Sequence, residues 1–71
     1  MPSAPKELQD KIAARFGSID LLGPLDFLKS RGFTERAGLI MPPSAEHKVS
    51  QDEGDCIDFL FREWDFAYVQ E

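Results

Sequence analysis

The stretch SQDEGDCIDFLFREWDFAYVQE, residues 50–71, decides the fold, because it combines the clearest helix start in the chain with its densest run of aromatic residues. Ser50 followed three residues later by Glu53 is a capping box, which predicts a helix that begins after Ser50. Acidic residues in the first turns of this helix suit the positive end of its dipole. At about 100° per residue, most of its large apolar side chains fall on one arc, which we interpret as the core face. That arc consists of Ile57, Leu60, Phe61, Trp64 and Tyr68, with Cys56 and Ala67 at its edge.

Phe59 and Phe66 fall on nearly the opposite side of the same helix. One helix cannot bury both arcs against a single neighbour, so three arrangements are open. Two other helices could sandwich it, or it could end near Asp65 so that residues 66–69 continue as an extended segment. In the third arrangement both rings are exposed, and aromatic anchors surrounded by charge are the usual make-up of a protein-binding surface. The contact set of that surface is Phe59, Phe66, Asp55, Arg62 and Asp65.

Two further helices are expected upstream. The first runs from about Pro5 to Arg15, with Ser3 or Ala4 at its cap and Gly17 after its end. An apolar stripe at positions i, i+4 and i+8 marks the face that this helix buries. The stripe consists of Leu8, Ile12 and Phe16.

The second upstream helix is expected from Pro24 to Arg31, since proline is well placed in a first helical turn. Its apolar residues are Leu25, Phe27 and Leu28. Gly32 suits the left-handed position that follows a helix, and Phe33 is then placed to fold back onto Leu28. This pattern predicts a Schellman motif at the end of the helix.

Residues 34–41, TERAGLIM, are ambiguous between an extended segment and one irregular turn, with a short buried run at Leu39-Ile40-Met41. Two prolines end this segment, and residues 42–49 are expected to form a loop. We therefore expect residues 1–71 to form a single small, mainly α domain. It would have about three helices, one short extended segment near Leu39–Met41, and a frayed terminus at residues 1–4. A small α+β arrangement is the alternative.

Composition and charge limit the possible functions. A chain of 71 residues is at most one domain, and a core of this size usually leaves only ~3–5 kcal/mol of net stability. Cys56 is the only cysteine, which fits a reducing compartment. No apolar run approaches the ~20 residues that span a bilayer, and no leader is recognisable, so a cytoplasmic location is expected and no membrane partner.

The net charge of −5 is unevenly distributed. Residues 52–71 hold seven acidic side chains against one basic one, whereas residues 1–51 hold six against seven. The C-terminal segment therefore carries all of the excess negative charge. It would repel a phosphate backbone and attract a basic protein surface, so nucleic acid is not expected as a partner.

No combination of residues predicts catalysis or a metal site. His47 is the only histidine and is interpreted as a solvated loop residue, and Cys56 as a small buried apolar residue. The acidic run at residues 52–55 lacks the ligand spacing of a calcium loop and is interpreted as a solvated helix start. The glycines form no phosphate-binding pattern. We therefore expect no enzyme, no cofactor and no metal.

Residues 25–40, LDFLKSRGFTERAGLI, have the outline of a helix-turn-helix, with Gly32 in the turn. A DNA-binding role would then depend on Lys29, Arg31 and Arg36. The preferred hypothesis is different: a small acidic accessory or regulatory protein that binds a basic protein surface through its C-terminal acidic-aromatic helix. An inhibitor that mimics nucleic acid, a small helix-turn-helix-like DNA-binding protein, and self-association through the aromatic patch are the alternatives.

Overall fold

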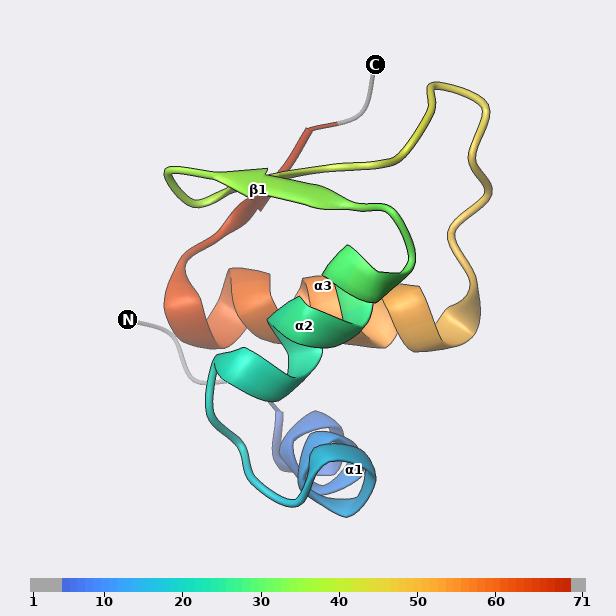
Figure 1. The fold of residues 1–71 in the computed structure, drawn as a ribbon. Helices are drawn as coiled ribbons and strands as arrows, with labels where there is room; N and C mark the ends of the chain where they lie inside the picture. The colour runs from blue at the N-terminus through green and yellow to red at the C-terminus, as the bar shows by residue number, and fades with distance from the viewer. Residues whose placement is uncertain (1–4, 70–71) are drawn as a thin grey trace.

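The computed structural model describes residues 5–69, and within them the chain forms three helices and one three-stranded sheet. In chain order the elements are α1 (Lys6–Phe16), α2 (Leu22–Ser30), β1 (Thr34–Arg36), β2 (Leu39–Met41), α3 (Gln51–Trp64) and β3 (Ala67–Tyr68). Figure 1 shows α3 lying across the molecule, with α2 in front of it, α1 below it and the sheet above it. The prediction of a mainly helical small domain is confirmed, with a minor β component. The frayed segment 1–4 and the cap at Ser3 or Ala4 lie outside the described residues.

Helix α1 buries the predicted stripe, since Leu8 and Ile12 belong to the core and Phe16 packs against it. The helix ends at Gly17, whose φ of 81° is a left-handed conformation that glycine adopts without steric cost. The Gly17 amide donates to the Ala13 carbonyl oxygen over 2.8 Å, which satisfies one of the last free acceptors of the helix.

Helix α2 begins at Leu22, two residues before the proline that was expected to open it. The carboxylate of Asp20 explains the earlier start, because its Oδ1 accepts a hydrogen bond from the Leu22 amide at 3.1 Å. Pro24 then occupies the third helical position, where the missing N–H has no intrahelical acceptor in any case.

The end of α2 matches the sequence pattern. The Gly32 amide donates to the Lys29 carbonyl and the Phe33 amide to the Leu28 carbonyl, both over 3.0 Å. Gly32 has a φ of 95°, and Phe33 is buried in the core. The predicted Schellman motif is confirmed.

Residues 34–41 form a β-hairpin. β1 pairs antiparallel with β2, with Thr34 opposite Met41 and Arg36 opposite Leu39. The two-residue turn between them, at residues 37 and 38, has positive φ at both positions, which is the backbone of a type I′ turn. A helix cannot continue through two such residues, so the second helix of the helix-turn-helix hypothesis is wrong.

The sheet is completed from the far end of the chain. After α3 ends at Trp64, Asp65 adopts a φ of 61° and the chain reverses into β3. β3 lies parallel to β2, with Leu39 opposite Ala67 and Ile40 opposite Tyr68. The arrangement in which the helix ends near Asp65 and residues 66–69 are extended is thus the observed one for Phe66.

The core lies where α3 meets the other elements. Every helix contributes to it, as do β2 and Phe33, which lies between α2 and β1. Its buried residues are Leu8, Ile12, Leu25, Leu28, Phe33, Ile40, Cys56, Phe59 and Leu60. Residues 42–50 connect β2 to α3 without regular secondary structure.

Candidate protein-binding surface on α3

The start of α3 is fixed by the predicted capping box. Ser50 Oγ accepts a hydrogen bond from the Glu53 amide at 3.3 Å, and Glu53 Oε1 accepts one from the Ser50 amide at 2.9 Å. The same Oε1 lies 3.0 Å from His47 Nε2, and the Arg31 guanidinium lies 3.9 Å from Glu53 Oε2. Glu53 therefore joins the start of α3 to the loop before it and to the residue after α2.

These contacts correct two expectations. His47 is half-buried rather than solvated, because it is bonded to Glu53 and packs edge-to-face on Phe33 at 5.2 Å. Glu53 is buried, so the acidic run is only partly a solvated helix start. The hydrogen bond from the Ser50 amide, with further help from His47, lowers the pKa of Glu53 even though burial acts in the opposite direction.

The core face of α3 is rotated from the predicted arc. Phe59 and Leu60 are fully buried, whereas Phe61 is 55% exposed and Trp64 is 37% exposed. Helix α1 causes this rotation by docking along the side of α3 that Phe59 occupies. Two contacts fix its position: Arg15 Nη1 lies 3.0 Å from Asp52 Oδ2, and Gln9 Nε2 lies 3.4 Å from Glu63 Oε2. The interpretation of Phe61 and Trp64 as core residues is therefore wrong.

The expected aromatic patch at positions 59 and 66 is wrong for the same reason. Phe59 has no exposed surface, and Phe66 is half-buried and packs against the core. The sandwich that would bury both arcs is not formed, because the residues that α3 buries lie on one face of the helix, and Phe59 belongs to that face. The early helix end accounts for Phe66.

The three charged residues of the expected contact set remain at the surface. Arg62 Nε lies 3.0 Å from Asp58 Oδ1, one helical turn earlier. Asp65 is exposed at the end of the helix, and Asp55 is half-buried and accepts a hydrogen bond from Gln51 at 3.0 Å. Arg62 and Asp65 lie on the outward side of α3 and at its end, whereas Asp55 lines the side that faces α1.

The apolar residues beside these charges are ones that the sequence assigned to the core. Ile57, Phe61 and Trp64 follow one another at i, i+4 and i+7, and we call them the aromatic stripe. Ile57 is half-buried and the other two are exposed. Because the stripe is continuous along one edge of a helix, it differs from scattered surface apolar residues, which need no explanation.

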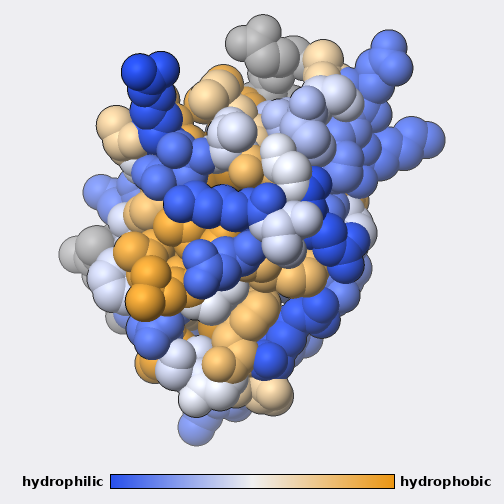
Figure 2. Space-filling view, in the orientation of Figure 1, coloured by the Kyte–Doolittle hydropathy of each residue, from blue (hydrophilic) through white to orange (hydrophobic). Residues whose placement is uncertain are grey.

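Exposed apolar side chains also occur elsewhere, at Ile19, Leu22, Leu39 and Val49. Figure 2 shows apolar surface, broken up by hydrophilic side chains, on the face of the molecule where Figure 1 places the first turn of α2. These four residues come from four separate segments of the chain, so none of them forms a helical stripe.

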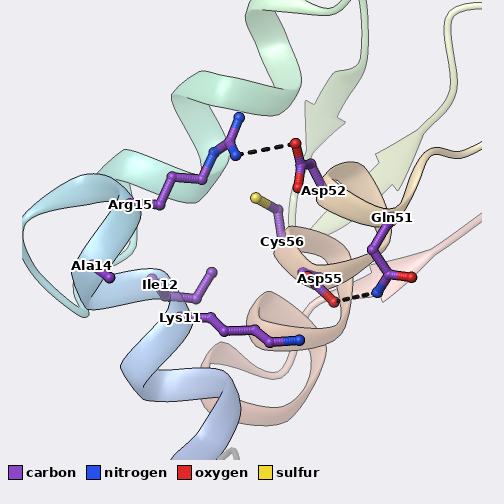
Figure 3. Close-up of a pocket in the computed structure, with 8 residues that line it drawn as sticks. All are labelled: Lys11, Ile12, Ala14, Arg15, Gln51, Asp52, Asp55 and Cys56. Carbon is purple, nitrogen blue, oxygen red and sulfur yellow. Dashed lines mark hydrogen bonds and ion pairs between the residues drawn. The ribbon is translucent and has the colours of Figure 1, made fainter.

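A groove of about 570 Å³ lies on the other side of α3, between that helix and α1. Figure 3 shows side chains of both helices converging on it, with the ion pair between Arg15 and Asp52 at one end. Its lining residues are Lys11, Ile12, Ala14, Arg15, Gln51, Asp52, Asp55 and Cys56. The Cys56 thiol is buried beneath it, as expected for a small apolar residue, and this burial raises its pKa to about 12.

Within residues 5–69 no three His, Cys, Asp or Glu side chains are grouped so that they could hold a metal ion. No helix in this described part of the chain is long and apolar enough to cross a bilayer.

Comparisons with known proteins give one result. Neither the curated proteins nor the solved structures contain a match to this chain. A family model matches residues 1–71, the whole of the sequence, and its description is "Phage Pam3 gp59 related protein". The protein belongs to the family of phage Pam3 gp59 related proteins.

Proposed function

We propose that the protein is a small non-enzymatic accessory or regulatory protein that docks onto a basic surface of another protein through the outward side of α3. The observation that carries the proposal is the exposure of Phe61 and Trp64 on a helix that buries Phe59 and Leu60 completely. Large aromatic side chains supply most of the binding energy of protein interfaces, and tryptophan is among the residues most enriched in them.

The charges around the stripe define the chemistry of the partner. Asp58 and Asp65 lie on the outward half of α3, and the only cation there, Arg62, is already paired with Asp58. A surface with lysine or arginine around an apolar site would complement this arrangement, and charge complementarity chiefly raises the association rate and the selectivity.

The side chains that could perform chemistry are engaged in the fold, which supports a binding role. The Cys56 thiol is buried with a pKa raised to about 12, so it is a poor nucleophile near neutral pH. His47 and Glu53 bind each other and hold the loop at the start of α3.

Mimicry of nucleic acid by the acidic segment has less support. Such a mimic needs an open array of carboxylates, but Asp52 is paired with Arg15 and Glu53 is buried. Competition by DNA would be its signature and is one outcome of the experiment below.

The proposal is tested by affinity capture with the full-length chain from cells that naturally contain it. The comparison uses wild type, Phe61→Ser and the matched control Ile19→Ser, which changes an apolar residue of similar exposure (45%) on the connection before α2. Thermal melts verify first that both variants are folded.

We expect a basic protein that wild type and Ile19→Ser retain and Phe61→Ser loses, with retention that falls as salt rises. Retention that is equal for all three proteins would refute the role of the stripe. Release of the captured protein by duplex DNA would favour mimicry instead.

A further inference from the structure

Strand β3 is a small part of the sheet. It has two residues and pairs on one side only, with β2, in the part of the chain that the structure describes. In Figure 1 it belongs to the red segment that rises from the end of α3 to the hairpin. Among its backbone hydrogen bonds, the Ala67 amide donates to the Gly38 carbonyl over 2.9 Å and the Val69 amide to the Ile40 carbonyl over 2.8 Å. Segments with few bonds and few buried contacts open at a lower free energy than the core.

The rest of the fold does not depend on β3 for its core. The buried core residues of the described chain all lie between positions 8 and 60, and residues 66–69 add only half-buried or exposed side chains. Asp65, with its φ of 61°, separates the segment from α3, so the segment can move without unwinding the helix. Detachment of β3 therefore leaves the three helices and the β1–β2 hairpin with their buried residues in place.

The segment nevertheless covers a specific site. Phe66 and Tyr68 are half-buried and both pack against the core, and the Tyr68 ring lies 6.4 Å from the ring of Phe33. Ile40, which is opposite Tyr68 in β2, is only 1% exposed. Without β3, the Gly38 and Ile40 carbonyls lose their donors and the core loses two aromatic rings that cover it. What is left is a strand edge beside an apolar surface.

We propose that residues 66–69 form a displaceable strap, which detaches from β2 while the rest of the fold stays intact and so opens the β2 edge to an extended segment of another protein. The strap itself defines the chemistry of that segment: it lies parallel to β2 and carries two aromatic side chains two positions apart, as Phe66 and Tyr68 are. In such strand addition, backbone hydrogen bonds supply affinity and alternate side chains supply selectivity. The site does not include Phe61 or Trp64, so the inference does not rest on the function proposed above.

Hydrogen exchange of the 71-residue chain, followed by NMR, tests the detachment. The Ala67 and Val69 amides report on the strap, and the Leu60 amide reports on the whole fold. Phe59→Leu weakens a core that the closed and the open forms share, so exchange at Leu60 should become roughly 5- to 30-fold faster. Exchange at Ala67 and Val69 should be faster than at Leu60 in wild type and unchanged by the substitution. Equal acceleration at all three amides would show that β3 opens only when the whole fold unfolds, and would overturn the proposal.

Occupation of the opened edge is tested with the acetylated and amidated peptide DFAYV, the sequence of residues 65–69, added at millimolar concentration. Ala67→Pro removes the amide that donates to Gly38 and leaves both aromatic side chains in place. Ala67→Ser keeps that amide and is the matched control, because the side chain of Ala67 is exposed. Loss of one hydrogen bond should raise the open fraction, and with it the affinity for the peptide, roughly 2- to 10-fold. Binding is read from the chemical shifts of the β2 amides, residues 39–41.

We expect the peptide to shift the β2 amides of Ala67→Pro more strongly than those of Ala67→Ser, and a peptide with serine in place of both aromatic residues to shift neither. Unshifted β2 amides in Ala67→Pro, or equal binding to both variants, would overturn the strand-addition site. An unfolded Ala67→Pro would also overturn the proposal, because detachment is proposed to leave the helices folded. Phe61→Ser should bind the peptide as wild type does, so the result is independent of capture through α3.

Discussion

Replacing Phe59 by leucine should destabilise the fold strongly, whereas the same replacement at Phe61 should have little effect. The two rings are two residues apart in the sequence, yet Phe59 has an exposed fraction of 0% and Phe61 one of 55%. Truncation of a buried phenylalanine to alanine costs about 3–5 kcal/mol, which equals the whole net stability expected of a chain this small. Leucine is the better probe, because it leaves enough folded protein to measure.

The stability lost in Phe59→Leu follows from the part of the core volume that leucine leaves empty. It keeps a branched apolar side chain in the core but leaves part of the ring volume empty, so we expect Phe59→Leu to cost roughly 1–2 kcal/mol. In a domain of this length each kcal/mol lowers Tm by roughly 4–8 °C, which gives a decrease of about 5–15 °C. Phe61→Leu is a surface change and should stay within about 0.5 kcal/mol of wild type.

Circular dichroism during urea and thermal unfolding measures both variants. The measurements belong at low protein concentration, so that self-association does not add to the apparent stability. Equal losses at the two positions, or a larger loss at Phe61, would show that α3 is rotated about its axis relative to the structure described above. The assignment of the aromatic stripe to the surface would then be wrong.

Two further predictions concern Glu53 and the hairpin turn. Glu53→Gln should lower the free energy of unfolding by roughly 1–3 kcal/mol, since glutamine cannot supply the charged acceptor for Ser50 and His47. In wild type the pKa of Glu53 lies below its ordinary value of 4.5, so the carboxylate stabilises the fold fully above that value and loses its contribution as pH falls through the folded pKa. Urea titrations from pH 7 to pH 3 should therefore show a smaller loss for Glu53→Gln than for wild type, and parallel curves would contradict this account. Ala37→Asn should raise the free energy of unfolding by roughly 0.5–1 kcal/mol, because Ala37 has a φ of 52° and asparagine tolerates that conformation better; an unchanged urea midpoint would refute this.

Local signals in the sequence were sufficient for the helix ends. The capping box at Ser50 and the Schellman motif at Gly32 depend only on residues within one turn of each helix end, and the structure contains both. The hairpin was harder to predict, because its turn is Ala37-Gly38 rather than the Asn-Gly pair that favours this backbone. Helix α2 begins at Leu22, two residues before the expected start, because Asp20, which lies outside the expected helix, accepts a hydrogen bond from the Leu22 amide.

The orientation of α3 could not be read from its own sequence. Phe59 and Phe61 lie at equal angles on either side of Leu60, and the apolar residues at positions 57, 64 and 68 tilt the helix pattern toward Phe61. The docking of α1 on the Phe59 side makes the choice, through contacts that join residues 37 and 54 positions apart in the chain. Of the expected contact set, Arg62 and Asp65 are exposed and Asp55 is half-buried, whereas Phe59 is buried in the core. Its role in binding stays a prediction.

Residues 52–71 carry the excess negative charge, but in the folded chain several of their acidic side chains are paired with arginines and do not form an open negative surface. Asp52, Glu53 and Asp58 each lie within 4 Å of a guanidinium, two of which come from the N-terminal half. Arg15 and Arg31 also stack on Phe27, at 4.6 and 4.8 Å from its ring centre, so both are held in place. Two of the seven acidic side chains of this segment, Asp52 and Glu53, therefore join α3 to other parts of the chain, and Asp58 is paired within α3. The charge that remains on the outward side of α3 is sparse, so in the proposed complex most of the affinity would come from the exposed rings of Phe61 and Trp64.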